Sequence, residues 1–174
     1  MSRALSSVCA VALTTSACTA GHDTIAQVEA CDVALSYVRH FQRSASKPNA
    51  VLKRVDGLQK SRSEIEQFVL GHPEHADDPD LELMLASADL RDQSPVIECN
   101  ALGDWLAHTG TLHDDPTIDQ ITRAGAEFPV AIVQFSMPVV TQDGKEAFLF
   151  TSEAYGPLAG SSQAVTLRKV SDGS

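Results

Sequence analysis

The sequence predicts an α+β fold in which a helical N-terminal half packs on one face of a C-terminal antiparallel β-meander of about three strands. Before His108, apolar residues recur at three- and four-residue spacing, which is typical of amphipathic helices. From Phe128 onward, apolar and polar residues alternate as in half-buried strands, and Asp143-Gly144 is a strong hairpin signal. The chain has 174 residues and 43% hydrophobic residues, which is enough for one domain with a sizeable core.

The N-terminus has the pattern of a secretory signal peptide. Arg3 supplies the positive start, Ala4–Leu13 the short apolar segment, and Thr14–Ala17 the small residues that precede a cleavage site. The apolar segment is far shorter than the ~20 residues that span a bilayer. Cys18 follows directly, in the manner of a bacterial lipoprotein site, although Thr15 stands where such sites usually have Leu.

These features predict the organisation and location of the chain. We expect a signal peptide over residues 1–17, a lipid on Cys18, a short tether over 18–23 and a single α+β domain over 24–174. The expected location is the periplasm or the outer membrane, with the membrane as a partner through the lipid. Cleavage that leaves a secreted, soluble protein is the alternative. The net charge of −10 disfavours binding to nucleic acids.

The four cysteines have different expected roles, according to where they lie in the sequence. Cys9 leaves with the signal peptide, and Cys18 is the lipid site or lies at the mature terminus. Because exported proteins meet oxidising conditions, we expect Cys31 and Cys99 to form a disulfide. Two separately buried thiols are the alternative.

The helices follow from apolar spacing and capping signals. The first is predicted over about Thr24–Gln42, with an apolar stripe that includes Cys31, and Ser44–Asp56 is a polar break. Ser63 and Glu66 have the spacing of a capping box for a second helix that ends at Gly71-His72-Pro73. Further helices are predicted over Leu81–Leu90, from Ser94-Pro95 to His108 with Cys99 on it, and after Thr117.

The last third resembles a family of uncharacterised bacterial exported proteins, in which an S-x-P strand leads to a D-G hairpin, a G-x-x-x-G loop and a strand that ends in a basic residue. The residues that carry the resemblance are Phe135-Ser136-Met137-Pro138-Val139, Asp143-Gly144-Lys145-Glu146-Ala147, Tyr155-Gly156-Pro157-Leu158-Ala159-Gly160 and Leu167-Arg168-Lys169. The resemblance implies no activity. Family members commonly continue with a Gly and a Trp that open a final strand, whereas here Val170–Ser174 follow. We therefore expect either a truncated chain or a sheet edge covered by something else, with a protein partner at the open edge as one possibility.

Few residues suggest a site. His72, His75 and Asp77 are weak metal candidates, because their spacing is not H-E-x-x-H and Pro73 interrupts a helix; a solvated acidic loop is the simpler interpretation. Ser152, Tyr155, Gly156 and Gly160 form a possible pocket or interaction site. The sequence suggests no catalytic residue and no cofactor.

The sequence thus favours an exported, lipid-anchored envelope protein that acts as a non-enzymatic binding or interaction module. The alternative is a small secreted hydrolase or a metal-dependent enzyme that uses the acidic loop with His72 and His75.

Overall fold

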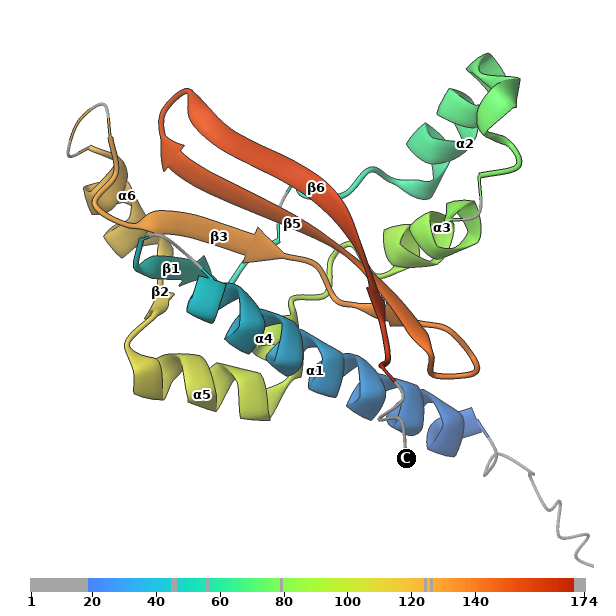
Figure 1. The fold of residues 1–174 in the computed structure, drawn as a ribbon, viewed down its shortest axis with the longest axis horizontal. Helices are drawn as coiled ribbons and strands as arrows, with labels where there is room; N and C mark the ends of the chain where they lie inside the picture. The colour runs from blue at the N-terminus through green and yellow to red at the C-terminus, as the bar shows by residue number, and fades with distance from the viewer. Residues whose placement is uncertain are drawn as a thin grey trace, which may run out of the picture.

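A computed structural model describes residues 19–44, 47–55, 57–78, 80–123, 125 and 127–170 (Figure 1). The fold is α+β, as predicted. The expected signal peptide and Cys18 lie outside the described residues. No helix in the described ranges is long and apolar enough to cross a membrane.

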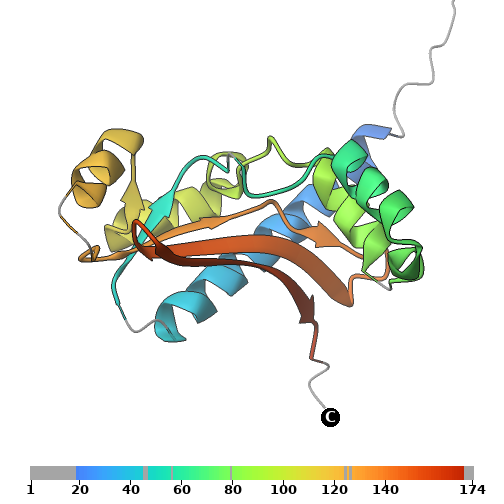
Figure 2. The same cartoon turned by 90° about the horizontal axis from the view of Figure 1, so that it is seen from above.

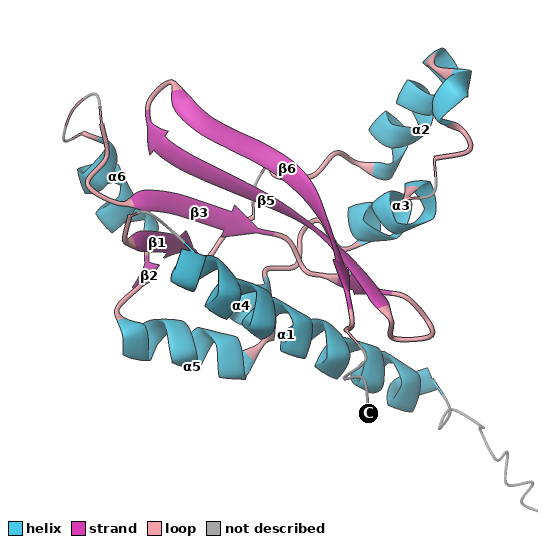
Figure 3. Cartoon of the chain, in the orientation of Figure 1, coloured by secondary structure: helices cyan, strands magenta, loops and turns pink. Residues whose placement is uncertain are grey.

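The centre of the fold is a mixed sheet with six strands in the described part of the chain: β1 (Asn49–Leu52), β2 (Leu112–His113), β3 (Ala131–Phe135), β4 (Val139–Val140), β5 (Glu146–Gly156) and β6 (Ala159–Arg168). β1 pairs in parallel with β2 and β3, whereas β3, β4 and β6 all pair antiparallel with β5. β2 and β6 lie at opposite borders of the sheet (Figure 3). The predicted number of strands, about three, was therefore too small, and the prediction missed both parallel pairs.

The missed strands are short and depend on distant partners. β1 lies inside the predicted polar break, yet all four of its residues are buried. It pairs with Ala131–Val133, far along the chain, and nothing local in its sequence marks that pairing. β2 has only two residues. Such strands carry too few residues to show an alternating pattern.

Helices cover both faces of the sheet, so the prediction of helices on one face was wrong. On one face lie α1 (Thr19–Ser44), α4 (Pro95–Glu98) and α5 (Asn100–Thr109). Their buried apolar side chains meet those of the sheet, including Ala34, Leu102, Val51, Phe135 and Leu149. On the opposite face, α6 (Asp115–Thr122) packs its Ile118 against Ala50, Leu52, Phe128 and Ile132. Successive strand residues point to opposite faces, which explains how β1 contributes to both clusters.

The remaining helices lie at the other end of the molecule. α2 (Arg62–Gly71), the 3-10 turn η1 (Pro73–His75) and α3 (Leu81–Asp89) are far from α6 in both views (Figures 1 and 2). α3 contacts β4 and β5, while α2 contacts α3 and η1. The unit formed by α2 and η1 therefore reaches the sheet through α3.

The boundaries of three predicted helices differ in the structure. α1 begins at Thr19, so it takes in residues 19–23 that were assigned to a tether. The capping box of α2 is formed by Ser61 and Glu64, two residues before the predicted pair. The predicted helix from Ser94-Pro95 to His108 is broken at Cys99 into α4 and α5.

A close contact at Gly103 explains why α4 and α5 pack so tightly. A Cβ atom on Gly103 would lie 2.9 Å from the carbonyl oxygen of Val96. Only glycine lets the two short helices approach to this distance. Ser94 precedes α4, as predicted, but its hydroxyl donates to the carbonyl oxygen of Lys53 instead of capping the helix.

Cys31 and Cys99 form a disulfide, with their Cα atoms 5.4 Å apart. Cys31 comes from the middle of α1, and Cys99 lies at the junction of α4 and α5 with only 2% of its surface exposed. The bond thus ties α1 to the junction of α4 and α5 at the main core.

Candidate interaction surface at the β6 edge

The hairpin of β5 and β6 forms one border of the sheet. β5 and β6 pair over almost their whole length, from Glu146 opposite Arg168 to Gly156 opposite Ala159, with an irregularity between Ala154 and Gly156. In the described part of the chain, β5 is the only strand that pairs with β6. The second hydrogen-bonding edge of β6 therefore has no strand partner in these ranges.

The hydrogen-bond pattern shows which residues face outward along this edge. Lys169 N donates to Lys145 O at 2.8 Å, which makes these two residues a hydrogen-bonded pair. Hydrogen-bonded and non-hydrogen-bonded pairs alternate along an antiparallel ladder. The odd-numbered residues of β6, such as Val165, therefore direct their N–H and C=O groups toward β5. Ser162, Ala164 and Thr166 consequently point their N–H and C=O groups away from the sheet.

The side chains of β6 do little to shield this edge. Every residue of β6 is exposed except Val165 and Leu167, which are half-buried. These two face the same side as α1, because they lie opposite Leu149 and Ala147 and pack at the margin of the main core. β6 has no proline, and its only charged residue is Arg168 at its end. Edge strands in soluble proteins usually carry charges, prolines or bulges that prevent further pairing.

The predicted site residues Ser152, Tyr155, Gly156 and Gly160 come together at the turn end of this hairpin. A Cβ atom on Gly160 would lie 2.6 Å from the carbonyl oxygen of Glu153, so glycine is needed for the close approach of the two strands. The Ser152 hydroxyl is 3.5 Å from Oε1 of Gln134. These contacts serve the hairpin, and the possible pocket or interaction site at these residues stays a prediction.

Two tyrosines lie near the carboxylate of Glu153 on the side of α1. The hydroxyl of Tyr155 donates to Glu153, and this hydrogen bond is the main reason why the pKa of Tyr155 is raised. Burial raises the pKa of Tyr37, which packs against Phe135, and the charge of Glu153 adds to the increase. Both phenols therefore stay neutral and can act only as hydrogen-bonding groups near neutral pH.

Comparison with models of protein families, with curated proteins and with solved structures finds no match. The family resemblance of the last third therefore stays a prediction, and the function has to be argued from the geometry.

A groove of about 1170 Å³ lies between α1, the segment after α3 and β4. Ala30, Met137 and Pro138 are the buried residues among those that line it, and Glu29 and Glu98 are exposed at its margin. None of the predicted site residues within the described ranges lines this groove.

The metal candidates lie at the end of α2, far from the β6 edge in sequence. His72 and His75 are close to one another, and Asp78 contacts His75 where Asp77 was expected. No group of three or more His, Cys, Asp or Glu side chains that could hold a metal ion occurs among the described residues.

The turn between β4 and β5 provides a pH-dependent contact. Thr141 Oγ1 and Lys145 N donate to Oδ1 of Asp143 at 2.8 and 3.1 Å. These hydrogen bonds, that from Thr141 above all, lower the pKa of Asp143 from its ordinary value of 3.8 to about 2. Because the folded-state pKa is depressed, the stabilisation is complete above about pH 5, well above the unfolded pKa, and is lost as the pH falls through about 2.

We therefore expect Asp143→Asn to melt at a lower temperature than the wild type near pH 6, and at nearly the same temperature near pH 2. The Asn side chain keeps an acceptor oxygen but has no charge, so the difference between the two proteins measures the contribution of the ionised carboxylate. Thermal unfolding of both proteins at several pH values checks this. A melting difference that does not change with pH would contradict it.

Proposed function

We propose that this protein is an exported, lipid-anchored envelope protein that binds another protein by strand addition at the outer edge of β6. The pattern of Arg3, the apolar segment Ala4–Leu13 and Cys18 supports export and the anchor. The disulfide of Cys31 and Cys99 is in keeping with an oxidising compartment.

The observation that carries the proposal is the outward row of backbone groups at Ser162, Ala164 and Thr166. An added strand would satisfy these N–H and C=O groups with main-chain hydrogen bonds, which supply affinity in this mode of recognition. The half-buried side chains of Val165 and Leu167 would pack against the partner on the side of α1. We thus expect a partner segment with apolar residues at alternate positions, since alternate side chains share a face.

Charge favours a partner that is neutral or basic over a second copy of this chain. The net charge of −10 makes two copies repel each other, and net charge of this size keeps proteins monomeric. β6 itself has no acidic residue, and its last residue is Arg168. Arg168 is held by Glu146 at 2.9 Å, so it does not present an unpaired charge to an incoming strand.

The test combines an edge-blocking variant with a matched control. Ala164→Pro removes an outward N–H group and leaves the bonds to β5 in place, because proline is tolerated on the solvent side of an edge strand. Ala164→Ser keeps the N–H group. A photo-crosslinking amino acid at Ser162, in cells of the native host, reports what lies beside the edge.

We expect a discrete crosslinked envelope protein from position 162 that is lost in Ala164→Pro and kept in Ala164→Ser. The same crosslinker at Gln67, an exposed residue of α2, should not give this product. If Ala164→Pro gave the same crosslinked product, strand addition would be overturned. If the crosslinked product were a dimer of this chain, the partner would be a second copy and not another protein. Intact mass of the protein from these membranes should show an acylated Cys18 as its first residue.

A further inference from the structure

The tip formed by α2 and η1 brings two histidines together. His72 directly precedes η1 and His75 ends it, so the two are three residues apart in the sequence. Their ring centroids are 6.3 Å apart. The ring of Phe68 lies against both, at 4.6 Å from His72 and 5.3 Å from His75, and limits the directions that the imidazoles can take.

Each imidazole is anchored through the same nitrogen. Nδ1 of His72 lies 3.1 Å from the carbonyl oxygen of Phe68, and Nδ1 of His75 lies 2.9 Å from Oδ2 of Asp78. A carbonyl and an ionised carboxylate can only accept hydrogen bonds, so Nδ1 carries the proton in both rings. In the neutral rings the lone pair is then on Nε2, which is the form that binds a metal ion.

We propose that His72 and His75 jointly bind one divalent transition-metal ion, of the class of Cu²⁺, Ni²⁺ or Zn²⁺, through their Nε2 atoms. Imidazole is a favoured ligand of these ions. A metal-binding histidine almost always donates its other ring N–H to a carboxylate or a backbone carbonyl, and both of these acceptors are present here.

The two rings are slightly farther apart than two rings that share one ion. An imidazole nitrogen binds such an ion at about 2.1 Å, so two rings on one ion have their centroids roughly 5 to 6 Å apart. His72 is exposed and the side chain of His75 is 42% exposed, so a small rotation can close the difference from 6.3 Å. The chain supplies two ligands, and water or a partner completes the coordination, which makes binding weaker than in a four-ligand structural site.

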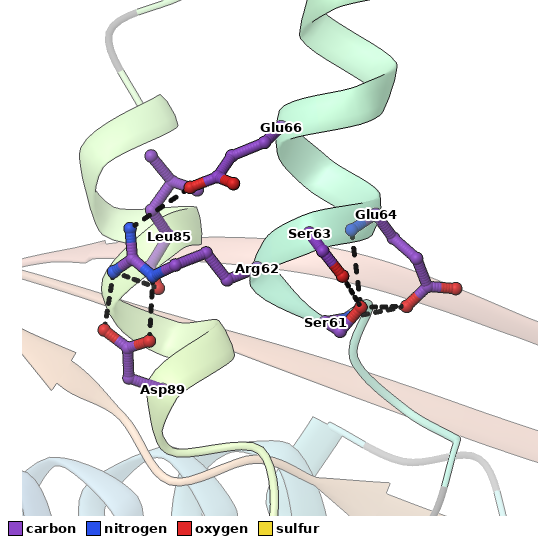
Figure 4. Close-up of polar contacts among 7 residues, drawn as sticks. All are labelled: Ser61, Arg62, Ser63, Glu64, Glu66, Leu85 and Asp89. Carbon is purple, nitrogen blue, oxygen red and sulfur yellow. Dashed lines mark hydrogen bonds and ion pairs between the residues drawn. The ribbon is translucent and has the colours of Figure 1, made fainter.

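The tip is held in place by contacts that do not involve the histidines. Arg62 donates from Nε to Asp89 Oδ1 at 2.9 Å and also bonds Leu85 O, which joins α2 to α3 (Figure 4). The hydrogen bond from Arg62 lowers the pKa of Asp89. Ser61 and Glu64 cap the first turn of α2 (Figure 4). A variant without either histidine should therefore keep its fold.

Titration of the purified mature protein with Cu²⁺, Ni²⁺ or Zn²⁺ salts tests the site. We expect one ion per chain, and His72→Ala and His75→Ala should each weaken binding by at least ten-fold. The matched control is His108→Ala, because His108 has the same kind of Nδ1 contact, at 2.7 Å from Asp104 O, but is not paired with a second histidine among the residues that the structure describes. Its affinity should equal that of the wild type.

Two substitutions of Asp78 test whether its carboxylate positions the His75 ring for metal binding. Asp78→Ala should reduce affinity about ten-fold or more, as loss of such an acceptor does, while Asp78→Asn should keep most of it. In the Cu²⁺ complex, electron paramagnetic resonance should show two equivalent nitrogen ligands. One nitrogen, or wild-type affinity in the two histidine variants, would overturn the site. The result is independent of the β6 edge, because Ala164→Pro should bind the ion normally.

Discussion

Replacing both Cys31 and Cys99 by Ala is expected to lower the free energy of unfolding by about 4 kcal/mol. The disulfide closes a loop with a sequence separation of 68 residues, and a cross-link over such a loop removes conformational freedom from the unfolded chain. A domain of ordinary stability has only about 5–15 kcal/mol in total, so the loss is a large part of it. Alanine is chosen because Cys99 is 2% exposed and a serine hydroxyl would be buried there.

Urea unfolding of the wild type and the double variant measures this loss. The slope of the free energy against urea should rise in the variant, because its unfolded chain is no longer constrained and exposes more surface. Wild-type protein kept reduced serves as the control, since it loses the bond but keeps both sulfur atoms. If both reduced and substituted proteins lost less than about 1 kcal/mol, the disulfide would not be a main source of stability.

The disulfide shows what sequence reasoning can achieve without a structure. The pairing was predicted from the N-terminal signal and the number of cysteines, neither of which depends on tertiary contacts. α3 and the turn at Asp143-Gly144 were predicted equally well, because their signals are local. The position of Cys99 was not, because the sequence predicts one helix from Ser94-Pro95 to His108 and the structure breaks it at Cys99.

The capping box of α2 shows the limit of local patterns. Ser61–Glu64 and Ser63–Glu66 both have the required spacing, and the structure uses the first pair. The sequence cannot choose between them, because Arg62 must also reach Asp89 on α3. Tertiary contacts decide between these two equivalent local signals, and they also form the buried strand β1, which has no local signal of its own.

The candidate interaction surface was only partly predictable. The sequence predicted a possible protein partner at an open sheet edge, but not which strand forms that edge. The register of β5 and β6 decides which residues direct their backbone groups outward at that edge. A shift of one residue would turn the even-numbered residues of β6 toward β5 and the odd-numbered ones outward. The anchoring of His72 and His75 was equally hidden, because it needs the fold of the turn between α2 and α3.

Phe148→Ala is expected to cost about 3–5 kcal/mol, as truncation of a fully buried phenylalanine does. Phe148 is 1% exposed and points away from Leu149, whose side chain belongs to the α1 face. Its side chain therefore lies on the face of the sheet opposite α1, and the sequence did not predict that helices cover this face. The neighbouring helix α3 contacts both β4 and β5.

Phe150 is the matched control for this face. It lies two residues further along β5, its ring packs edge-on at 5.1 Å from Phe148, and it is only half-buried. Phe150→Ala should thus cost clearly less than Phe148→Ala, and Phe148→Leu should recover much of the loss because it refills most of the volume. Chemical unfolding of the three variants gives the order. Equal losses at both positions would mean that the second face is no better packed at Phe148 than at Phe150.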